Sequence, residues 1–348
     1  MKFLNDAFDR FAEKAPISVM VRALIENALS PERLDAIFDE NAKQQYSGDL
    51  MFSTVADIMG QVVCQIHPSV NAAYLDRKEE IGVTVKSVYD KLKGIETPVS
   101  RALVHDTAMR LQAIIKQTGG INKPLLAGYR TKIVDGNHLR HTDRRIGEFG
   151  NVRVYRRITV KLNEPTRDGD AEVHIVTNLP KRVGAIHIAD LYRDRWKIET
   201  AFQEVAKSLE GEIQAMGYPK AALFGFCMAL VTYNFLSVVR AAVHAVHGEE
   251  AANNLSTYYV SLEVSSTHFG MSVILEGEFW RKKYGQLTPR KMAEELKRLA
   301  RNIRLSKFKK GKWTRKKKTK KKMNKKNRGH KSTLRILEES RTRTAKAA

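Results

Sequence analysis

Apolar residues recur at three- and four-residue steps over the first 128 residues, which is the spacing of amphipathic helices. The positions that set this pattern are Phe8, Phe11, Val21, Leu24, Ile25 and Leu29. Ser30 followed by Pro31 adds a helix start, because serine caps free backbone amides and proline fits the first helical turn. The pattern therefore predicts a helical N-terminal region.

The pattern changes after Gly128 to short runs that are rich in β-branched residues. Residues 129–135 have the pattern of a strand that ends at Asp135. Residues 152–162 and 172–177 have the pattern of two further strands, and the Pro, Asp and Gly between them favour a turn. The sequence therefore predicts a β-hairpin in the middle of the chain.

Helical spacing returns further along the chain. Helices are expected at about 188–209 and within 285–303, where Pro289 marks the start. Residues 221–239 hold 19 positions without a charge, which suits either a helix buried in a large core or a helix that spans a membrane. The Thr, Tyr, Asn and Ser within this run favour the buried helix, so no membrane partner is expected.

The charge balance points to a polyanionic partner. The chain carries 61 Lys and Arg against 38 Asp and Glu, a net charge of +23, and cationic side chains that neutralise phosphates release counterions. Between 304 and 331, 16 of 28 residues are basic and none is acidic. This segment suits an extended nucleic-acid contact, with Phe308 and Trp313 available for stacking, or a solvated tail. Its densest lysines are Lys316, Lys317, Lys318, Lys320, Lys321 and Lys322.

The two cysteines, Cys64 and Cys227, stand far apart and outside any Cys-x-x-Cys motif. Their spacing excludes an encoded disulfide framework and an encoded zinc site. The N-terminus has no apolar stretch typical of a secretion signal. These features predict a cytoplasmic protein, and the positive charge suggests association with the bacterial nucleoid.

Residues 83–92 have the pattern of a helix that reads DNA. In a helix-turn-helix, the second helix offers polar side chains to phosphates and bases. Lys86, Ser87, Tyr89 and Lys91 are available for this role. An ordinary amphipathic helix of a bundle has the same spacing and is the interpretation that the sequence alone favours.

The expected helix at 188–209 holds Tyr192, Arg195 and Glu199 at spacings of three and four, which puts them on one helical face. Arg195 can bind a phosphate through two hydrogen bonds, and Glu199 can ligate a hard cation beside it. The simpler alternative is an exposed ion pair between Arg195 and Glu199.

The string YRDRWKIETAF at 192–202 resembles the Y-x2-R-x3-E signature of the insertion-sequence-four family of DDE transposases. Asp135, within IVDGNHL, resembles the first catalytic aspartate of that family. The resemblance implies a ribonuclease-H-like core in which Asp135 and Glu199 hold Mg²⁺ or Mn²⁺, with Tyr192 and Arg195 contacting DNA. It also implies two-metal cleavage and transfer of DNA strands, and pairing of element ends by a homodimer.

Two departures from the family pattern lower the expected activity. The family has a lysine seven positions after the glutamate; here that position is Ala206, and Lys207 is one position late, turned by about 100° on a helix. No apolar strand that ends in aspartate lies between Leu139 and Val152. The second catalytic aspartate is therefore missing, as if the chain were internally deleted near 148–151.

Asp190 does not replace the missing aspartate, because nine residues of helix put it about 13.5 Å from Glu199 along the axis. The loss of one of three carboxylates weakens Mg²⁺ binding. The expected function is therefore that of a transposase by origin with impaired strand transfer. The alternatives are a catalytically dead DNA-binding remnant that competes with an intact transposase, and a general basic protein that binds nucleic acid.

The fold class expected from these observations is α/β (α+β). The expected regions are a helical DNA-binding region at 1–128, an incomplete ribonuclease-H-like core with a hairpin remnant at 129–245, a C-terminal helical region at 246–303 and a basic, disordered tail at 304–348. The core region is expected to be truncated near 148–151.

Overall fold

A computed structural model describes most of the chain. The described residues are 2–120, 126–129, 156–165, 169, 171–193, 201, 209 and 217–310. They fall into two compact units, which are described separately below. The first, the helical unit, lies within Met1–Glu148 and Trp196–Lys310, and the second lies within Phe149–Arg195 and Gly311–Ala348.

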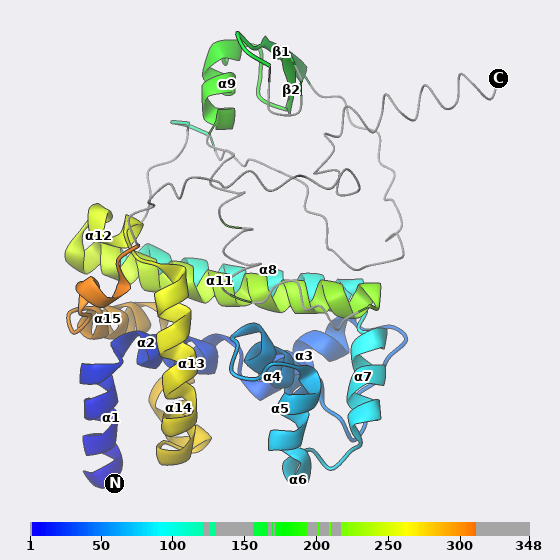
Figure 1. The fold of residues 1–348 in the computed structure, drawn as a ribbon, viewed down its shortest axis with the longest axis vertical. Helices are drawn as coiled ribbons and strands as arrows, with labels where there is room; N and C mark the ends of the chain where they lie inside the picture. The colour runs from blue at the N-terminus through cyan, green and yellow to red at the C-terminus, as the bar shows by residue number, and fades with distance from the viewer. Residues whose placement is uncertain are drawn as a thin grey trace, which may run out of the picture. The chain divides into compact units, whose positions relative to one another are not determined.

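The described part of the helical unit consists of α-helices and one 3₁₀ helix, joined by loops (Figure 1). Its N-terminal part holds α1 (Lys2–Lys14), α2 (Pro16–Ala28), α3 (Pro31–Asn41), α4 (Phe52–Val63), α5 (Val70–Asp76), α6 (Lys78–Ile81), α7 (Val85–Gly94) and α8 (Thr97–Thr118). Its C-terminal part holds α11 (Pro219–His247), α12 (Glu249–Asn253), α13 (Thr257–Ile274), α14 (Gly277–Tyr284), α15 (Pro289–Ala300) and the 3₁₀ helix η1 (Leu305–Phe308). The described residues thus confirm the helical N-terminal region expected from the apolar spacing.

Two helices begin where the sequence signals predicted. The Ser30 side chain accepts a hydrogen bond from the Arg33 backbone N–H at the start of α3, and Pro31 occupies the first turn. Thr288 does the same for the Lys291 backbone N–H at the start of α15. These caps satisfy amides that have no partner within the helix.

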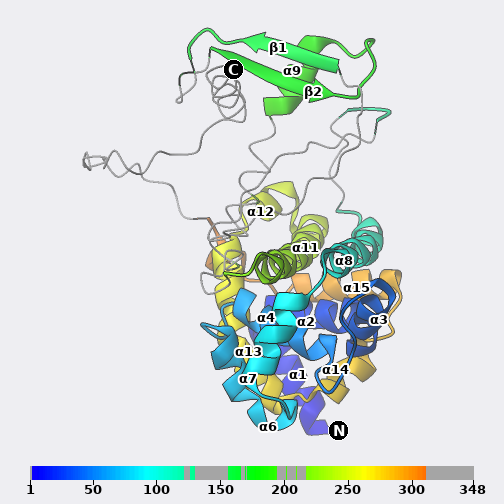
Figure 2. The same ribbon diagram turned by 90° about the vertical axis from the view of Figure 1, so that its right-hand side faces the viewer.

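The long helix α11 is the centre of the helical unit. It is apolar on nearly all sides and packs against α8, α4, α15, α2, α7 and α12. Figures 1 and 2 show α8 and α11 running side by side. At the end of α8, a Cβ on Gly120 would lie only 2.2 Å from the Ala241 carbonyl oxygen, so this close approach requires glycine.

Among the described residues, α11 is the one helix long and apolar enough to cross a membrane. Of its most apolar window, 61% is buried inside the structure. A core helix of a large fold has both properties. The burial therefore favours the interpretation of residues 221–239 as a buried helix.

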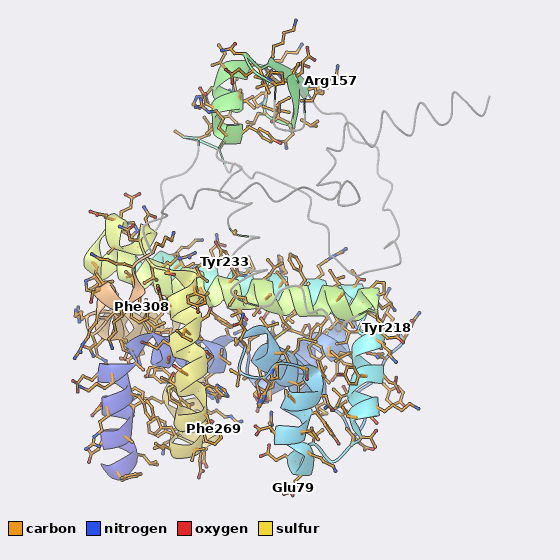
Figure 3. All side chains as sticks on the ribbon, viewed as in Figure 1. Glu79, Arg157, Tyr218, Tyr233, Phe269 and Phe308 are labelled. Carbon is orange, nitrogen blue, oxygen red and sulfur yellow. The ribbon has the colours of Figure 1, made fainter. Side chains whose placement is uncertain are left out.

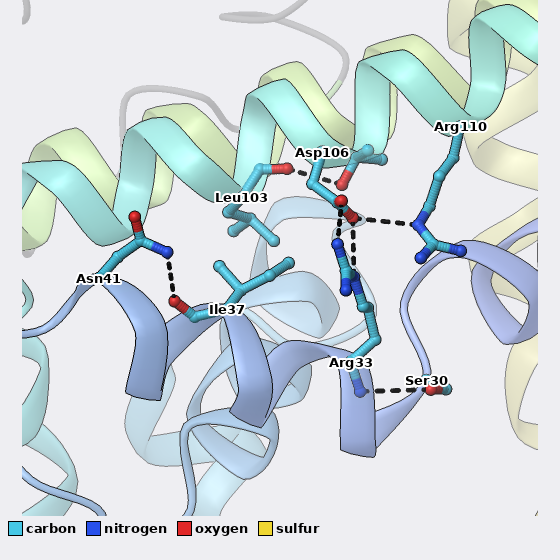
Figure 4. A network of polar contacts seen from close by, with 8 residues as sticks. Ser30, Arg33, Ile37, Asn41, Leu103, Asp106 and Arg110 are labelled. Atoms are coloured by element: carbon cyan, nitrogen blue, oxygen red, sulfur yellow. Dashed lines mark hydrogen bonds and ion pairs between the residues drawn. The ribbon is translucent and has the colours of Figure 1, made fainter.

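A carboxylate ties α3 to α8 (Figure 4). Asp106 on α8 accepts hydrogen bonds from the Nε and Nη2 atoms of Arg33 on α3, and from Nε of Arg110 at 3.1 Å. Partial burial works to raise the pKa of Asp106, but the two arginines outweigh it and the pKa falls below its ordinary value. The clamp is thus held by a carboxylate that stays ionised.

An aromatic cluster joins α1 to α14. The ring of Phe8 lies 5.7 to 6.3 Å, centre to centre, from the rings of Phe279, Trp280 and Tyr284. The indole of Trp280 donates a hydrogen bond to the Leu275 carbonyl, which satisfies its one polar group. Buried aromatic pairs of this kind add to the stabilisation from apolar burial.

The second unit contains the predicted hairpin. Strands β1 (Arg156–Lys161) and β2 (Glu172–Thr177) pair antiparallel, with Arg156 opposite Thr177 and Lys161 opposite Glu172. Helix α9 (Ala185–Arg193) follows and begins slightly before the helix expected at 188–209. The strand expected to end at Asp135 lies outside the described residues.

The described residues form a mostly helical structure with a small two-stranded sheet, which agrees with the broad α+β class. Helix α11 packs with helices that precede and follow it in the chain, although the expected boundaries put most of it in a core region at 129–245. Helix α11 packs with these helices because its apolar surface must be buried, and the N-terminal helices cover most of that surface.

Glu96 closes the loop that follows α3. One of its carboxylate oxygens accepts the backbone N–H groups of Lys43, Gln44 and Gln45 at 2.8, 2.8 and 3.2 Å. The bond from Gln44 is the largest cause that lowers the pKa of Glu96 below its ordinary value, and burial opposes it. The ionised form of Glu96 therefore stabilises the fold.

We predict that Glu96→Gln lowers the free energy of unfolding by about 1–2 kcal/mol at pH 7, because a neutral acceptor replaces a charged one. Since the folded pKa is the lower one, this stabilisation is complete above the unfolded pKa of about 4.3 and is lost as pH falls through the folded pKa. Urea unfolding at pH 7 and in acid measures the difference. Equal differences at both pH values would contradict the charge-based account, and exposed Glu79→Gln serves as control.

Candidate nucleic-acid interface

Most of the residues expected to cleave or bind DNA lie outside the described part of the chain. These are the expected catalytic residues Asp135 and Glu199 and the expected DNA contacts Arg195, Lys207, Lys316, Lys317, Lys318, Lys320, Lys321 and Lys322. Among the described residues, no group of three or more His, Cys, Asp or Glu could hold a metal ion. The magnesium site therefore stays a prediction from the sequence.

Tyr192 is the one motif residue that the structure describes. It lies half-buried in the last turn of α9, on the helix that follows the hairpin. Asp190 on the same helix is exposed and pairs with Arg193, with 3.0 Å between the carboxylate oxygen and Nη1. The motif thus begins on a helix, as its spacing predicted.

Helix α7 follows a tight turn. Gly82 has a φ of 69°, a left-handed conformation that glycine adopts at little cost, and it separates α6 from α7. The Tyr74 hydroxyl on α5 donates to the Val83 carbonyl at 2.8 Å, and Val88 and Leu92 are buried. Helix α4 packs against both α5 and α7, so three helices support the turn.

The start of α7 is held by Thr84. Its hydroxyl oxygen accepts the backbone N–H of Ser87 at 3.2 Å. Lys86 and Ser87 follow Val85 and are exposed, and the Ser87 hydroxyl also lies 3.0 Å from the Thr84 hydroxyl, within hydrogen-bond distance. The first turn of α7 therefore presents a lysine and a hydroxyl to solvent, which is where a recognition helix contacts bases.

The other predicted lysine of this helix is engaged within the fold. Lys91 donates to the Tyr46 carbonyl at 2.6 Å and lies 4.2 Å from the centre of the Phe38 ring, and burial lowers its pKa. Lys93 pairs with Asp90 at 3.3 Å. Of the two lysines expected to bind DNA from α7, Lys86 faces solvent and Lys91 contacts the protein's own backbone and ring.

A larger positive surface lies on α15 and η1. Its residues up to Arg301 precede the basic segment expected from the sequence, and residues 304–310, expected within a disordered tail, are folded as η1 and the hydrogen-bonded segment that follows it. Helix α15 buries Met292, Ala293, Leu296, Leu299 and Ala300. The side of α15 opposite these buried residues, together with the segment from Arg301 to Lys310, is called the basic face below. The basic face consists of Arg290, Lys291, Lys297, Arg298, Arg301, Arg304, Lys307, Lys309 and Lys310.

Few carboxylates neutralise the basic face. Arg290 pairs with Glu294 at 3.2 Å, and Arg298 pairs with Glu295 at 2.7 Å. Burial would raise the pKa of Glu295, but the bonds from Arg298 and the buried Tyr284 hydroxyl lower it overall. No other residue of the basic face has an ion pair within the described ranges, so most of its positive charge is open to a ligand.

The end of the basic face is fixed to the fold by backbone bonds. The Ser256 N–H donates to the Phe308 carbonyl at 2.7 Å, and the Lys310 N–H donates to the Asn254 carbonyl at 2.9 Å. The Phe308 ring is buried, with 4% of its surface exposed (Figure 3). The expectation that Phe308 stacks on bases is therefore wrong; its apolar ring instead anchors the segment, while Trp313 lies outside the described residues.

The signal that could have located the basic face was available in the sequence. From 281 to 310, 12 residues are Lys or Arg and two are Glu, and the basic positions of α15 fall on the side opposite its apolar ones. No family model, curated protein or solved structure matches the chain. The function is therefore inferred from the residues themselves.

We predict that Thr84→Ala costs about 1 kcal/mol of unfolding free energy, because the Ser87 amide loses its acceptor. Thr84→Ser keeps an acceptor at the same position and should stay close to the wild type. Urea unfolding compares the three proteins, and amide exchange at Ser87 should be faster in the alanine variant alone. Identical behaviour of the two variants would show that the hydroxyl does not cap α7.

Proposed function

We propose that this chain is a DNA-binding protein of transposase origin that holds the phosphate backbone with its basic face. The observation that carries the proposal is the folded, exposed set of lysines and arginines on α15 and η1, most of which have no ion pair among the described residues. The sequence continues from this face into the lysine-rich stretch that ends at 331. DNA of the bacterial nucleoid is the partner that this distribution fits.

The dimensions of α15 suit a DNA backbone. Its 12 residues extend about 18 Å at 1.5 Å per residue. Duplex DNA carries one negative charge per about 1.7 Å, or on the order of ten charges over that length. Several phosphates therefore lie within reach of the basic face at once, and each contact releases a counterion.

The form of helix α7 favours duplex DNA as the ligand over a polyanion without a regular shape. A capped helix after a tight turn, with Lys86 and Ser87 at its exposed start, has the form that enters a major groove. In the proposal, the basic face supplies affinity and α7 supplies preference for a site. A general basic protein would lack the second property.

We expect the double variant Lys291→Glu with Arg301→Glu to bind duplex DNA more weakly and with less dependence on salt. Each lost phosphate contact should reduce the slope of log affinity against log salt by about 0.9, so two reduce it by about 2. Fluorescence anisotropy over a salt series measures this slope. Both residues are exposed, so the fold should tolerate the change.

The matched control is Arg101→Glu with Lys116→Glu, which changes the same charge at exposed positions of α8. Its slope should stay near that of the wild type. Equal losses in the two double variants would mean that net charge, not the basic face, sets the affinity. A wild-type slope near zero would rule out phosphate binding.

Strand cleavage is a second candidate function, and the order of elements favours it. The hairpin β1–β2 precedes α9, and the Y-x2-R-x3-E string begins at Tyr192 in the last turn of that helix. In this proposal, Asp135 and Glu199 hold Mg²⁺ or Mn²⁺, while Arg195 and Lys207 contact phosphates. The missing second aspartate leaves the metal set incomplete, so activity is expected to be impaired.

We predict that the purified chain, incubated with DNA that carries the ends of its own element and Mg²⁺ or Mn²⁺, yields no strand-transfer product. Residual nicking, if measured, should disappear in Glu199→Gln. Gel analysis of end-labelled DNA provides the readout. Full strand transfer that Glu199→Gln abolishes would contradict the impaired activity and reveal a complete metal set.

A further inference from the structure

A small pocket, called the α13 pocket below, lies where α13 and α14 pack against α2. Its volume is about 50 Å³, which is room for roughly three to five water molecules at 10–15 Å³ each. Three buried side chains, Met271, Leu275 and Trp280, form its apolar walls. Ser272 and Gly277 also line it and are exposed, so the pocket is open to solvent.

Two polar groups at the α13 pocket are already used within the fold. The indole N–H of Trp280 donates to the Leu275 carbonyl at 3.1 Å. The Ser272 hydroxyl donates to the Phe269 carbonyl at 2.9 Å. Neither group has a hydrogen left for a ligand, so a ligand must be held by the two other polar side chains that line the pocket.

Those two side chains are Arg22 and His268. His268 is half-buried, and neither of its ring nitrogens has a hydrogen bond within the described residues. Arg22 donates from Nη2 to Glu26 at 3.3 Å, and its other N–H groups have no partner in the described part of the chain. An arginine only donates hydrogen bonds, and a protonated histidine does the same. The pocket therefore suits a ligand that accepts hydrogen bonds.

The charges beside the α13 pocket favour an anion. The buried carboxylate of Glu26 lies 3.3 Å from Nη2 of Arg22 and 3.7 Å from Nε of Arg281. One negative charge thus faces two positive ones, which leaves one positive charge unbalanced. A ligand with a single negative charge would balance it.

We propose that the α13 pocket binds the carboxylate of a small organic acid of the size of acetate, with Arg22 and His268 donating to its oxygens. Its methyl group would lie against the apolar walls. Acetate has about four non-hydrogen atoms, which agrees with the volume of the pocket. Phosphate or sulfate would place an oxygen against the apolar walls, where it loses its hydrogen bonds to water. The proposal does not rest on nucleic-acid binding, because no residue of the basic face lines the pocket.

The protonation of His268 should change when the acid binds. Burial lowers the pKa of His268 below its ordinary value, and the charge of Arg22 lowers it further. His67, in the loop after α4, also disfavours the protonated form, whereas Asp57 of α4 and Asp76 of α5 favour it. A carboxylate between Arg22 and His268 offsets the repulsion between them. Binding should therefore take up a proton and become tighter as pH falls through the range in which histidine titrates.

NMR of the full chain with labelled histidine tests this site, with sodium acetate as the probe and His268→Gln to assign the signal. Acetate should raise the pKa of His268 and bind about 10-fold more tightly at pH 5.5 than at pH 8, with a dissociation constant in the millimolar range. Sodium chloride at equal ionic strength should leave the His268 signal unchanged. An equal response to chloride would mean an adventitious ion only, and either that result or no response to acetate would overturn the proposal.

Variants test which side chains hold the acid. Arg22→Gln and His268→Gln should each weaken acetate binding about 10-fold or more, and in His268→Gln the remaining affinity should no longer depend on pH. His105→Gln, at an exposed position of α8, is the matched control and should bind acetate as the wild type does. Wild-type affinity in both pocket variants would overturn the assignment. Circular dichroism checks that each variant stays helical, and the pH dependence of the wild type decides the matter even if Arg22→Gln unfolds.

The shape of the acid provides an independent test in the wild-type protein. Butyrate has an unbranched chain that can extend through the open side of the pocket, so it should bind about as well as acetate. Pivalate is branched next to its carboxylate and is too wide for the volume, so it should bind about 10-fold more weakly or not at all. Equal binding of butyrate and pivalate would show that the acid lies outside the α13 pocket.

Discussion

The burial of α11 is the constraint on which the rest of the helical unit depends. A 29-residue helix that is apolar on nearly all sides cannot stay in water, so helices from both ends of the chain must cover it. Helix α15 does so with its apolar side, which leaves the basic face in solvent. Helix α7 also packs on α11, so the same core fixes both surfaces proposed to contact DNA.

The two surfaces differ in charge because of their local interactions. On α7, Lys91 contacts Tyr46 and Phe38, so little positive charge is left there, and the contact proposed for α7 depends on its shape. On α15 and η1, two glutamates face nine basic residues, so charge dominates. Two surfaces fixed by one core thus differ in the kind of contact proposed for them.

Several elements of the fold could be predicted from the sequence, because their signals are local. Ser30 and Pro31 begin α3, and the hairpin follows the β-branched runs. The inward contacts of Lys91 and the burial of Phe308 depend on residues distant in the chain, so no local pattern reveals them. Asp135 and Glu199, which carry the resemblance to DDE transposases, lie outside the described residues.

The central claim is that α15 and η1 form the surface that holds DNA. Lysine acylation footprinting of the full chain, with and without duplex DNA and read by mass spectrometry, tests it most directly. DNA should protect Lys291, Lys307 and Lys309, while Lys78 and Lys116, which are exposed elsewhere on the helical unit, should keep their reactivity. Equal protection of all five lysines, or none on the basic face, would contradict the account.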